Sequence, residues 1–265
     1  MFIKNKNCEK CGYSYDPVLE SCPNCKEHNV DIEKCGIPKN IFWLNVPLQL
    51  LLFIVGFVYG GMLLFNVLYY ACFQAIETEE LRSFIAICLS YATIFAIGVG
   101  IVCFNSKGFK KFLFDPKGYY FGLAFMVGLF ILSMILNLIT ANITEEVNDN
   151  QNAIELYVRN YPVISLLIFG VIGPIVEEFT YRVGLFSCLR RLNRVLAYAV
   201  TIIVFGLIHF SFDTENLLVE LANLPSYLLA GAVFSLAYDV KGPMCSITAH
   251  IAYNLTSLTM ILLRS

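Results

Sequence analysis

Residues 118–141 read GYYFGLAFMVGLFILSMILNLITA, a stretch of 24 residues without a charged side chain. As a helix it would be about 36 Å long, at 1.5 Å per residue, and the hydrocarbon core of a bilayer is about 30 Å thick. The stretch therefore predicts a transmembrane helix. The whole chain has the same character, since 58% of its 265 residues are hydrophobic and only 14% are charged. Soluble domains have about 25% charged residues, so a water-soluble globule is excluded.

Apolar blocks of this kind recur along the chain and predict an all-α, polytopic membrane bundle with about seven transmembrane helices. The blocks lie near 42–73, 82–104, 118–141, 162–188, 195–212, 222–239 and 243–263. The first block is long for a single crossing. Its glycines Gly56, Gly60 and Gly61 leave open a broken helix that crosses twice, which would invert the topology of everything after it.

The distribution of Lys and Arg predicts the orientation, because these residues are enriched in short cytoplasmic loops. With the N-terminus inside, 14 of the 18 basic residues fall on the cytoplasmic side. The outer loops carry acidic residues instead, among them Glu145, Asp213 and Glu220. We therefore expect a multi-pass protein of the cell membrane, with its N-terminus in the cytoplasm and its C-terminus outside.

The first 40 residues differ from the rest because they are polar and contain two cysteine pairs. Cys8, Cys11, Cys22 and Cys25 form the pattern C-x2-C-x10-C-x2-C. Four thiolates so spaced suit a tetrahedral, structural Zn²⁺ site, and the segment resembles the zinc ribbons of prokaryotic membrane-protein N-termini. Two disulfides are the alternative, which a reducing cytosol disfavours.

This cysteine pattern divides the chain into a cytosolic zinc-ribbon head, residues 1–40, and a transmembrane domain, residues 41–265. His28 and Cys35 are spare ligands for the head. The head is expected either to bind a protein partner or substrate or simply to stabilise the N-terminus. The remaining cysteines are expected to be small apolar packing residues; they are Cys72, Cys88, Cys103, Cys188 and Cys245.

Ionisable residues within the apolar blocks mark a candidate site, because each costs at least a few kcal/mol in a membrane. They fall in three segments, and they are Glu177, Glu178, Arg182, His209, His250 and the polar Asn254. Residues four apart share a helix face, so Glu178 can pair with Arg182 and His250 can align with Asn254. Glu177 and His209 are about equally far from the turn at Arg190–Arg194, which predicts that they meet.

Such a cluster has two possible chemistries. A carboxylate and an imidazole can activate a water molecule, while a second imidazole and an amide stabilise an oxyanion. Alternatively, Glu177, His209 and His250 can bind a catalytic Zn²⁺ with one open position. The order EExxxR, FxxxH, HxxxN resembles the three motifs of the CAAX prenyl endopeptidase and bacteriocin-processing (Abi, CPBP) intramembrane proteases, over about residues 162–258.

The resemblance implies a role for each residue. Glu177 and His209 activate water, Glu178 and Arg182 hold the site together, and His250 and Asn254 stabilise the oxyanion. It implies an intramembrane endopeptidase acting on a peptide or membrane-protein substrate, in peptide or protein maturation, bacteriocin immunity or signalling. The resemblance leaves open whether the mechanism is of the metalloprotease or the glutamate type.

Structural and non-catalytic alternatives stay open at this stage. Glu178 and Arg182 can be an intramembrane ion pair alone, and each histidine can be a satisfied core residue. Intramembrane Glu and His also mark proton-coupled transporters, and a catalytically silent scaffold or immunity protein would keep the same fold. A nucleic-acid partner is excluded, because 18 basic against 20 acidic residues supply no basic excess.

Overall fold

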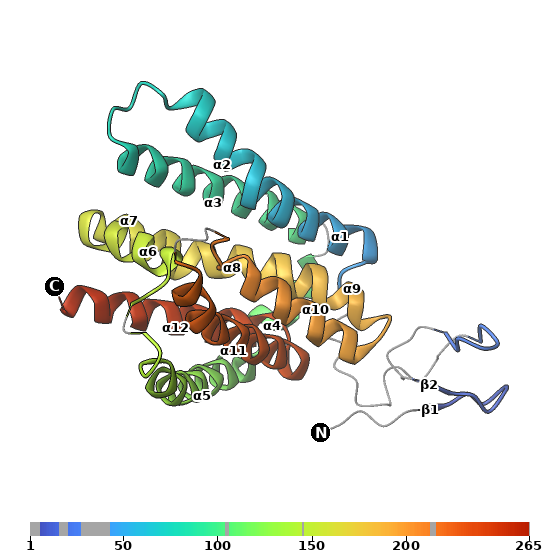
Figure 1. Ribbon diagram of the computed structural model, residues 1–265. Coiled ribbons are helices and arrows are strands. Elements are labelled where there is room, and N and C mark those ends of the chain that lie inside the picture. The colour runs from blue at the N-terminus through green and yellow to red at the C-terminus, as the bar shows by residue number, and fades with distance from the viewer. Residues whose placement is uncertain are drawn as a thin grey trace.

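The computed structural model describes residues 6–15, 21–27, 43–103, 106–144, 146–212 and 216–264. It is an all-α bundle preceded by a small head with two short strands (Figure 1). The strands are β1 (Lys6–Asn7) and β2 (Ser14–Tyr15). The helices, with π-helical segments labelled η, are α1 (Val46–Ile54), η1 (Val55–Leu63), α2 (Leu64–Val67), η2 (Leu68–Cys72), α3 (Glu79–Cys103), α4 (Ser106–Leu113), α5 (Pro116–Thr140), α6 (Asp149–Asn160), α7 (Pro162–Leu167), η3 (Ile168–Ile172), α8 (Gly173–Glu177), η4 (Glu178–Phe186), α9 (Ser187–Arg190), α10 (Arg194–Leu207), α11 (Leu217–Lys241) and α12 (Pro243–Leu263).

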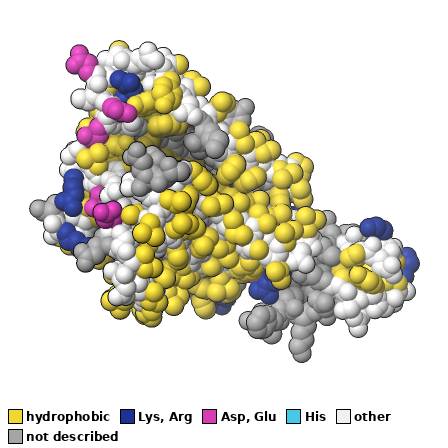
Figure 2. Space-filling view, in the orientation of Figure 1, with side chains coloured by type: hydrophobic (Ala, Val, Ile, Leu, Met, Phe, Trp, Pro, Cys, Tyr) yellow, Lys and Arg dark blue, Asp and Glu magenta, His cyan; other side chains and the backbone are white. Residues whose placement is uncertain are grey.

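Each predicted apolar block contains a helix, and the polytopic membrane bundle is confirmed. Within the described residues, five helices are long and apolar enough to cross a bilayer, and they are Glu79–Cys103, Pro116–Thr140, Pro162–Arg190, Leu217–Lys241 and Pro243–Leu263. Large apolar side chains such as Leu123, Val127 and Ile131 of α5 are exposed. In Figure 2 such side chains form a broad hydrophobic band over the bundle, with charged side chains towards its ends.

The first block forms one continuous helix from Val46 to Cys72, so it does not cross twice. Its glycine Gly56 faces the η4 helix, where an added Cβ would clash with the side chain of Thr180. Gly184 on η4 approaches the same helix, with an added Cβ 2.9 Å from the Phe53 nitrogen. These glycines therefore bring the helices into close contact rather than breaking the first one.

The predicted span 195–212 is corrected by the structure, because the helix α10 ends at Leu207. Its 14 residues give a length of about 21 Å, which is short of the bilayer core. After Leu207 the backbone turns, with His209 N–H donating to the Gly206 carbonyl at 3.2 Å and Phe210 N–H to the Leu207 carbonyl at 3.3 Å. His209 therefore lies in a turn, not inside a helix as its apolar neighbours indicated.

The continuous helical run from Pro162 to Arg190 carries the first motif through the centre of the bundle. Half of its most apolar 18-residue stretch is buried inside the bundle, which is a larger share than in the other long helices. Figure 1 shows it between the α2–α3 hairpin on one side and α12 and α5 on the other. Pro174 in this run has no N–H to donate to the Gly170 carbonyl, and the run is π-helical just before it, at Ile168–Ile172, and again from Glu178 to Phe186. Such π-helical turns often occur at functional sites.

Candidate functional site

Three side chains from separate segments converge inside the bundle. Glu177 ends α8, His209 follows α10, and His250 lies on α12. Glu177 Oε2 is 4.0 Å from His209 Nε2 and 3.7 Å from His250 Nε2. The side chains of Glu177 and His209 are 12% and 17% exposed, so they remain reachable, whereas His250 is buried. The predicted meeting of Glu177 and His209 is thus seen in the structure.

Glu178 links His250 to Arg182. Its Oε1 lies 2.9 Å from His250 Nδ1 and 3.0 Å from Arg182 Nη1, and both Glu178 and Arg182 are fully buried. The arginine also stacks over the ring of Phe205, 4.3 Å from its centroid. Because Nδ1 of His250 is engaged by Glu178, its other ring nitrogen, Nε2, is the one that faces Glu177.

Asn254 lies one turn beyond His250 on α12, and its amide is engaged with the backbone. Its Nδ2 donates to the Phe169 carbonyl at 3.0 Å. This carbonyl belongs to the π-helical segment η3, which precedes Glu177. An asparagine amide has two N–H groups, so one bond to Phe169 leaves a second donor.

Two tyrosines at the site were not predicted. Tyr91 of α3 donates its hydroxyl to Glu177 Oε1 at 3.4 Å. The ring of Tyr227, on α11, stacks on His209 with centroids 4.7 Å apart and planes 17° apart. The chain has 15 tyrosines, most of them within apolar blocks, so residue type alone gave no signal to distinguish these two.

The distances within the site also test whether Glu177, His209 and His250 can bind a catalytic metal ion. Ligands 2.0–2.1 Å from a tetrahedral Zn²⁺ lie about 3.3 Å apart, whereas Glu177 is 3.7 Å and 4.0 Å from the two imidazoles. Within the described part of the chain, only the four cysteines of the head bring three or more Cys, His, Asp or Glu ligand atoms within 4.8 Å of one another. The donor types suit zinc, but the donor positions in this structure are too widely spaced.

The cysteines of the head form a compact cluster that could hold a metal ion such as zinc. Cys8 Sγ is 3.5 Å from Cys25 Sγ, and Cys11 Sγ is 3.6 Å from Cys22 Sγ. These distances are far longer than the 2.05 Å of a disulfide. The Tyr13 backbone N–H lowers the pKa of the Cys11 thiol to about 6, which favours the thiolate that binds metal. His28 and Cys35, the spare ligands, lie outside the described residues.

The two cysteine pairs share one backbone geometry. The backbone carbonyl of Cys8 accepts a hydrogen bond from Gly12 N–H at 2.8 Å, and the backbone carbonyl of Cys22 accepts one from Lys26 N–H at 2.9 Å. Gly12 and Lys26 both have positive φ, +69° and 59°, as the tight turn after each second cysteine requires. The two strands beside the first turn pair in antiparallel fashion. The head is therefore built from two similar cysteine turns that face each other.

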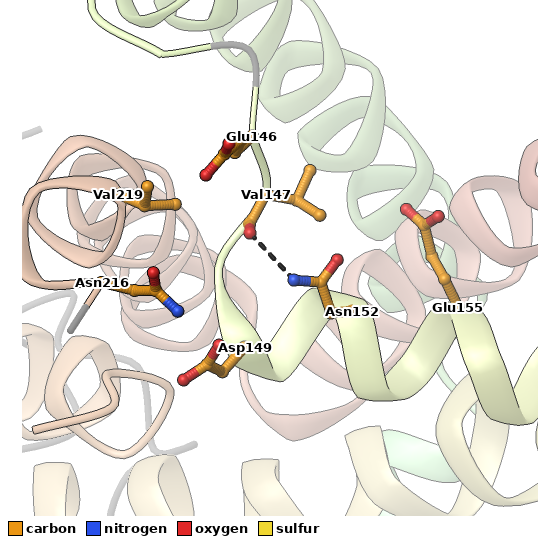
Figure 3. A pocket seen from close by; sticks show the side chains of 7 residues that line it. All are labelled: Glu146, Val147, Asp149, Asn152, Glu155, Asn216 and Val219. Atoms are coloured by element: carbon orange, nitrogen blue, oxygen red, sulfur yellow. Dashed lines mark hydrogen bonds between the residues drawn. The ribbon is translucent and has the colours of Figure 1, made fainter. Parts of the chain in front are cut away.

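A separate cavity of about 340 Å³ lies near the start of α6. Figure 3 shows Asp149, Asn152 and Glu155 of this helix around it, with Glu146 and Val147 before the helix and Asn216 and Val219 across from it. Two of the lining residues are joined by a hydrogen bond, since Asn152 Nδ2 donates to the Val147 carbonyl at 3.2 Å. None of the motif residues lines this cavity, so it is not the site defined by Glu177.

The fold and the cluster together define a multi-pass helical membrane protein with a carboxylate and two imidazoles gathered inside the bundle. Residues 159–256 match the model of the type II CAAX prenyl endopeptidase Rce1-like family. The match contains all three motifs, from Glu177 to Asn254, and confirms the family resemblance of this segment. It is a match to a family of peptidases. No curated protein and no solved structure matches the chain significantly.

Proposed function

We propose that this protein is an intramembrane endopeptidase that hydrolyses a peptide bond in or near the bilayer, with water activated by Glu177 as the nucleophile. The observation that carries the proposal is the approach of Glu177 Oε2 to the imidazoles of His209 and His250, at 4.0 Å and 3.7 Å. These groups lie within the segment that matches the peptidase family. A half-buried but reachable carboxylate with no Lys or Arg within 4.0 Å, among the described residues, is suited to act as a general base.

In the proposed reaction, Glu177 takes a proton from a water molecule that His209 orients. The resulting hydroxide adds to the scissile carbonyl carbon. The oxyanion then accepts hydrogen bonds from an N–H of Asn254 and from Nε2–H of His250, in the form of the imidazole that carries a proton on both nitrogens while Nδ1 faces Glu178. The C–N bond then breaks as the leaving nitrogen receives the proton from Glu177. The new carboxylic acid gives its proton to the amine, so the products are a carboxylate and an ammonium group. Glu178 and Arg182 hold His250 in place without taking part in proton transfer.

We propose the glutamate-type mechanism rather than a metalloprotease. The spacing of Glu177, His209 and His250 supports this choice, because Glu177 Oε2 lies 4.0 Å and 3.7 Å from the two imidazole nitrogens. A zinc ion that bound Glu177, His209 and His250 would supply a Lewis acid and a bound hydroxide. The two mechanisms differ in how activity responds to removal of metal.

The substrate class that we propose is a peptide or membrane protein, with prenylated CAAX-type chains as the first to test because of the family matched. Maturation of a secreted peptide, bacteriocin immunity and signalling are the roles open to such an enzyme. We propose the cytoplasmic N-terminus and outside C-terminus from the distribution of Lys and Arg. The transmembrane domain would then begin near residue 41, after the head.

The test is cleavage by the detergent-purified protein of a mass-encoded peptide library that contains prenylated CAAX peptides and their unprenylated counterparts. We expect cleavage at defined bonds, and we expect a membrane-permeant chelator to leave the rate of cleavage unchanged. A Cys22→Ser variant, whose head holds no zinc, separates an effect of metal loss from the head from an effect at Glu177. Loss of activity on chelation in both proteins would favour the metal mechanism. No cleavage of any peptide by folded protein would instead favour a scaffold or a transporter.

We propose that the head binds one structural Zn²⁺ and serves as a docking module for a protein partner. Elemental analysis should give one zinc per chain, and Cys22→Ser should lose it, because a four-thiolate site cannot keep its geometry with three ligands. Cys72→Ser is the matched control, since Cys72 is exposed and far along the chain from the head. Zinc retained at full occupancy in Cys22→Ser would contradict this assignment.

A further inference from the structure

A second buried carboxylate lies beside His209 and outside the three motifs. Glu220, in the first turn of α11, is fully buried, although its position in an outer polar stretch indicated a solvent-exposed acid. Its Oε1 accepts from Asp149 N–H at 2.8 Å. Its Oε2 accepts from Ser211 N–H at 3.0 Å and from Asn148 Nδ2 at 3.4 Å. Three N–H donors therefore hold this buried carboxyl group firmly in one position.

Asn148 connects this carboxylate directly to His209. Its Nδ2 donates to the His209 carbonyl at 3.0 Å as well as to Glu220. Its Oδ1 accepts from the Gln151 backbone N–H at 3.2 Å, as the N-cap of α6, and from the Tyr227 hydroxyl at 3.0 Å. Asn148 is itself 2% exposed. One buried amide therefore joins the start of α6, the start of α11 and the turn that carries His209.

His209 needs such support because it lies past the end of α10, where no helical hydrogen-bond ladder fixes it. The structure supports it at three points. Asn148 binds its carbonyl, Glu220 binds the amide two residues later, at Ser211, and the Tyr227 ring stacks on its imidazole. The ring of Tyr227 is in turn oriented through its hydroxyl by Asn148.

We propose that Glu220, acting through Asn148 and Tyr227, is a positioning residue that fixes the imidazole of His209 opposite Glu177. This inference rests on the proposed function, since it assigns the carboxylate a place in the water-activating machinery. The alternative is that this network, the hydrogen bonds of Asn148 with His209, Glu220 and Tyr227, only stabilises the contact of α6 with α11. A displacement of about 1 Å in a catalytic group can cost about 10²-fold in rate, so the two roles differ in their effect on kcat.

The experiment compares two variants that disturb the network in different ways. Glu220→Gln places an NH₂ group where the carboxylate accepted N–H donors. Asn148→Ser removes the donor to His209 and Glu220 but keeps an oxygen that can cap α6. Glu155→Gln is the matched control, because Glu155 lies on the same helix α6 and outside the network. Both network variants should lower kcat by about 10–100-fold, with KM changed much less, and Glu155→Gln should change neither.

A second measurement reports on His209 without needing activity. Hydrogen–deuterium exchange at the imidazole C2 position, read by mass spectrometry, resolves His209 from His250 because the chain has only three histidines. We expect exchange at His209 to change in both network variants, while exchange at His250 and exchange in Glu155→Gln stay as in the wild type.

The inference would be overturned if folded Asn148→Ser and Glu220→Gln showed the same exchange at His209 as the wild type. It would also be overturned if these variants lost turnover without a change in that exchange. If Glu220→Gln does not fold, Asn148→Ser decides the question alone. If the wild type cleaves nothing, the proposed function fails, and the exchange measurement still decides whether Glu220 positions His209.

Discussion

Glu177→Gln should lower kcat/KM for peptide cleavage by about 10³-fold, within the range that a general base contributes. The glutamine keeps the size of the side chain but cannot accept a proton from water. The variant should still fold, because Glu177 is partly accessible and its neighbours, Tyr91 and the two histidines, can also hydrogen-bond an amide. Initial rates on the best library peptide, with the folded fraction measured by size-exclusion chromatography, give the comparison.

Glu146→Gln is the control for this variant, because Glu146 borders the separate cavity in Figure 3 and touches no motif residue. It should cleave as the wild type does. Retention of more than a tenth of wild-type activity by Glu177→Gln would mean that Glu177 is not the base, and His209 would be the next candidate.

The second large effect is expected on stability. Glu178→Gln removes the charge that faces Arg182 and His250 in the bundle, at 3.0 Å and 2.9 Å. Breaking a fully buried pair by removing one partner costs about 3–5 kcal/mol, because the other charge stays buried without compensation. We expect a lower melting temperature in detergent and a lower yield of monodisperse protein, and Arg182→Met should behave similarly.

The chain offers a matched control for this pair. Glu155 and Arg159 have the same four-residue spacing on α6, but they are 3.9 Å apart with side chains 33% and 43% exposed. An exposed pair of this kind contributes about 0–1 kcal/mol, so Arg159→Met should barely change the melting temperature. If Glu178→Gln melted like the wild type while losing its activity, Glu178 would act in catalysis rather than in holding the site.

Much of the fold could be predicted because the membrane imposes a simple rule, which is one apolar block for each buried helix. The motif residues followed from the same rule, since an ionisable side chain such as Glu178 or Arg182 stands out among apolar neighbours. The close approach of Glu177 and His209 could be predicted from helix length alone, as both lie at similar distances from the turn that joins their segments.

Other features could not be predicted because the local sequence around them indicates a different structure. The residues around His209 are as apolar as those of a helix, so the sequence indicated a span up to 212 where the backbone in fact turns after Leu207. The helix α6 is polar and carries no membrane signal. Glu220 resembled an ordinary acid of an outer loop, and only the structure shows that N–H groups of Asn148, Asp149 and Ser211 surround it.

The central claim is that Glu177 and His209 act together on one water molecule, and a double-mutant comparison tests it most directly. Rates of peptide cleavage would be measured for the wild type, Glu177→Gln, His209→Ala and the double variant, all shown to be folded. Residues that act as a unit are strongly non-additive, so we predict that the double variant is no slower than the slower single variant. Independent losses that multiply in the double variant, or substantial cleavage by either single variant, would contradict the account.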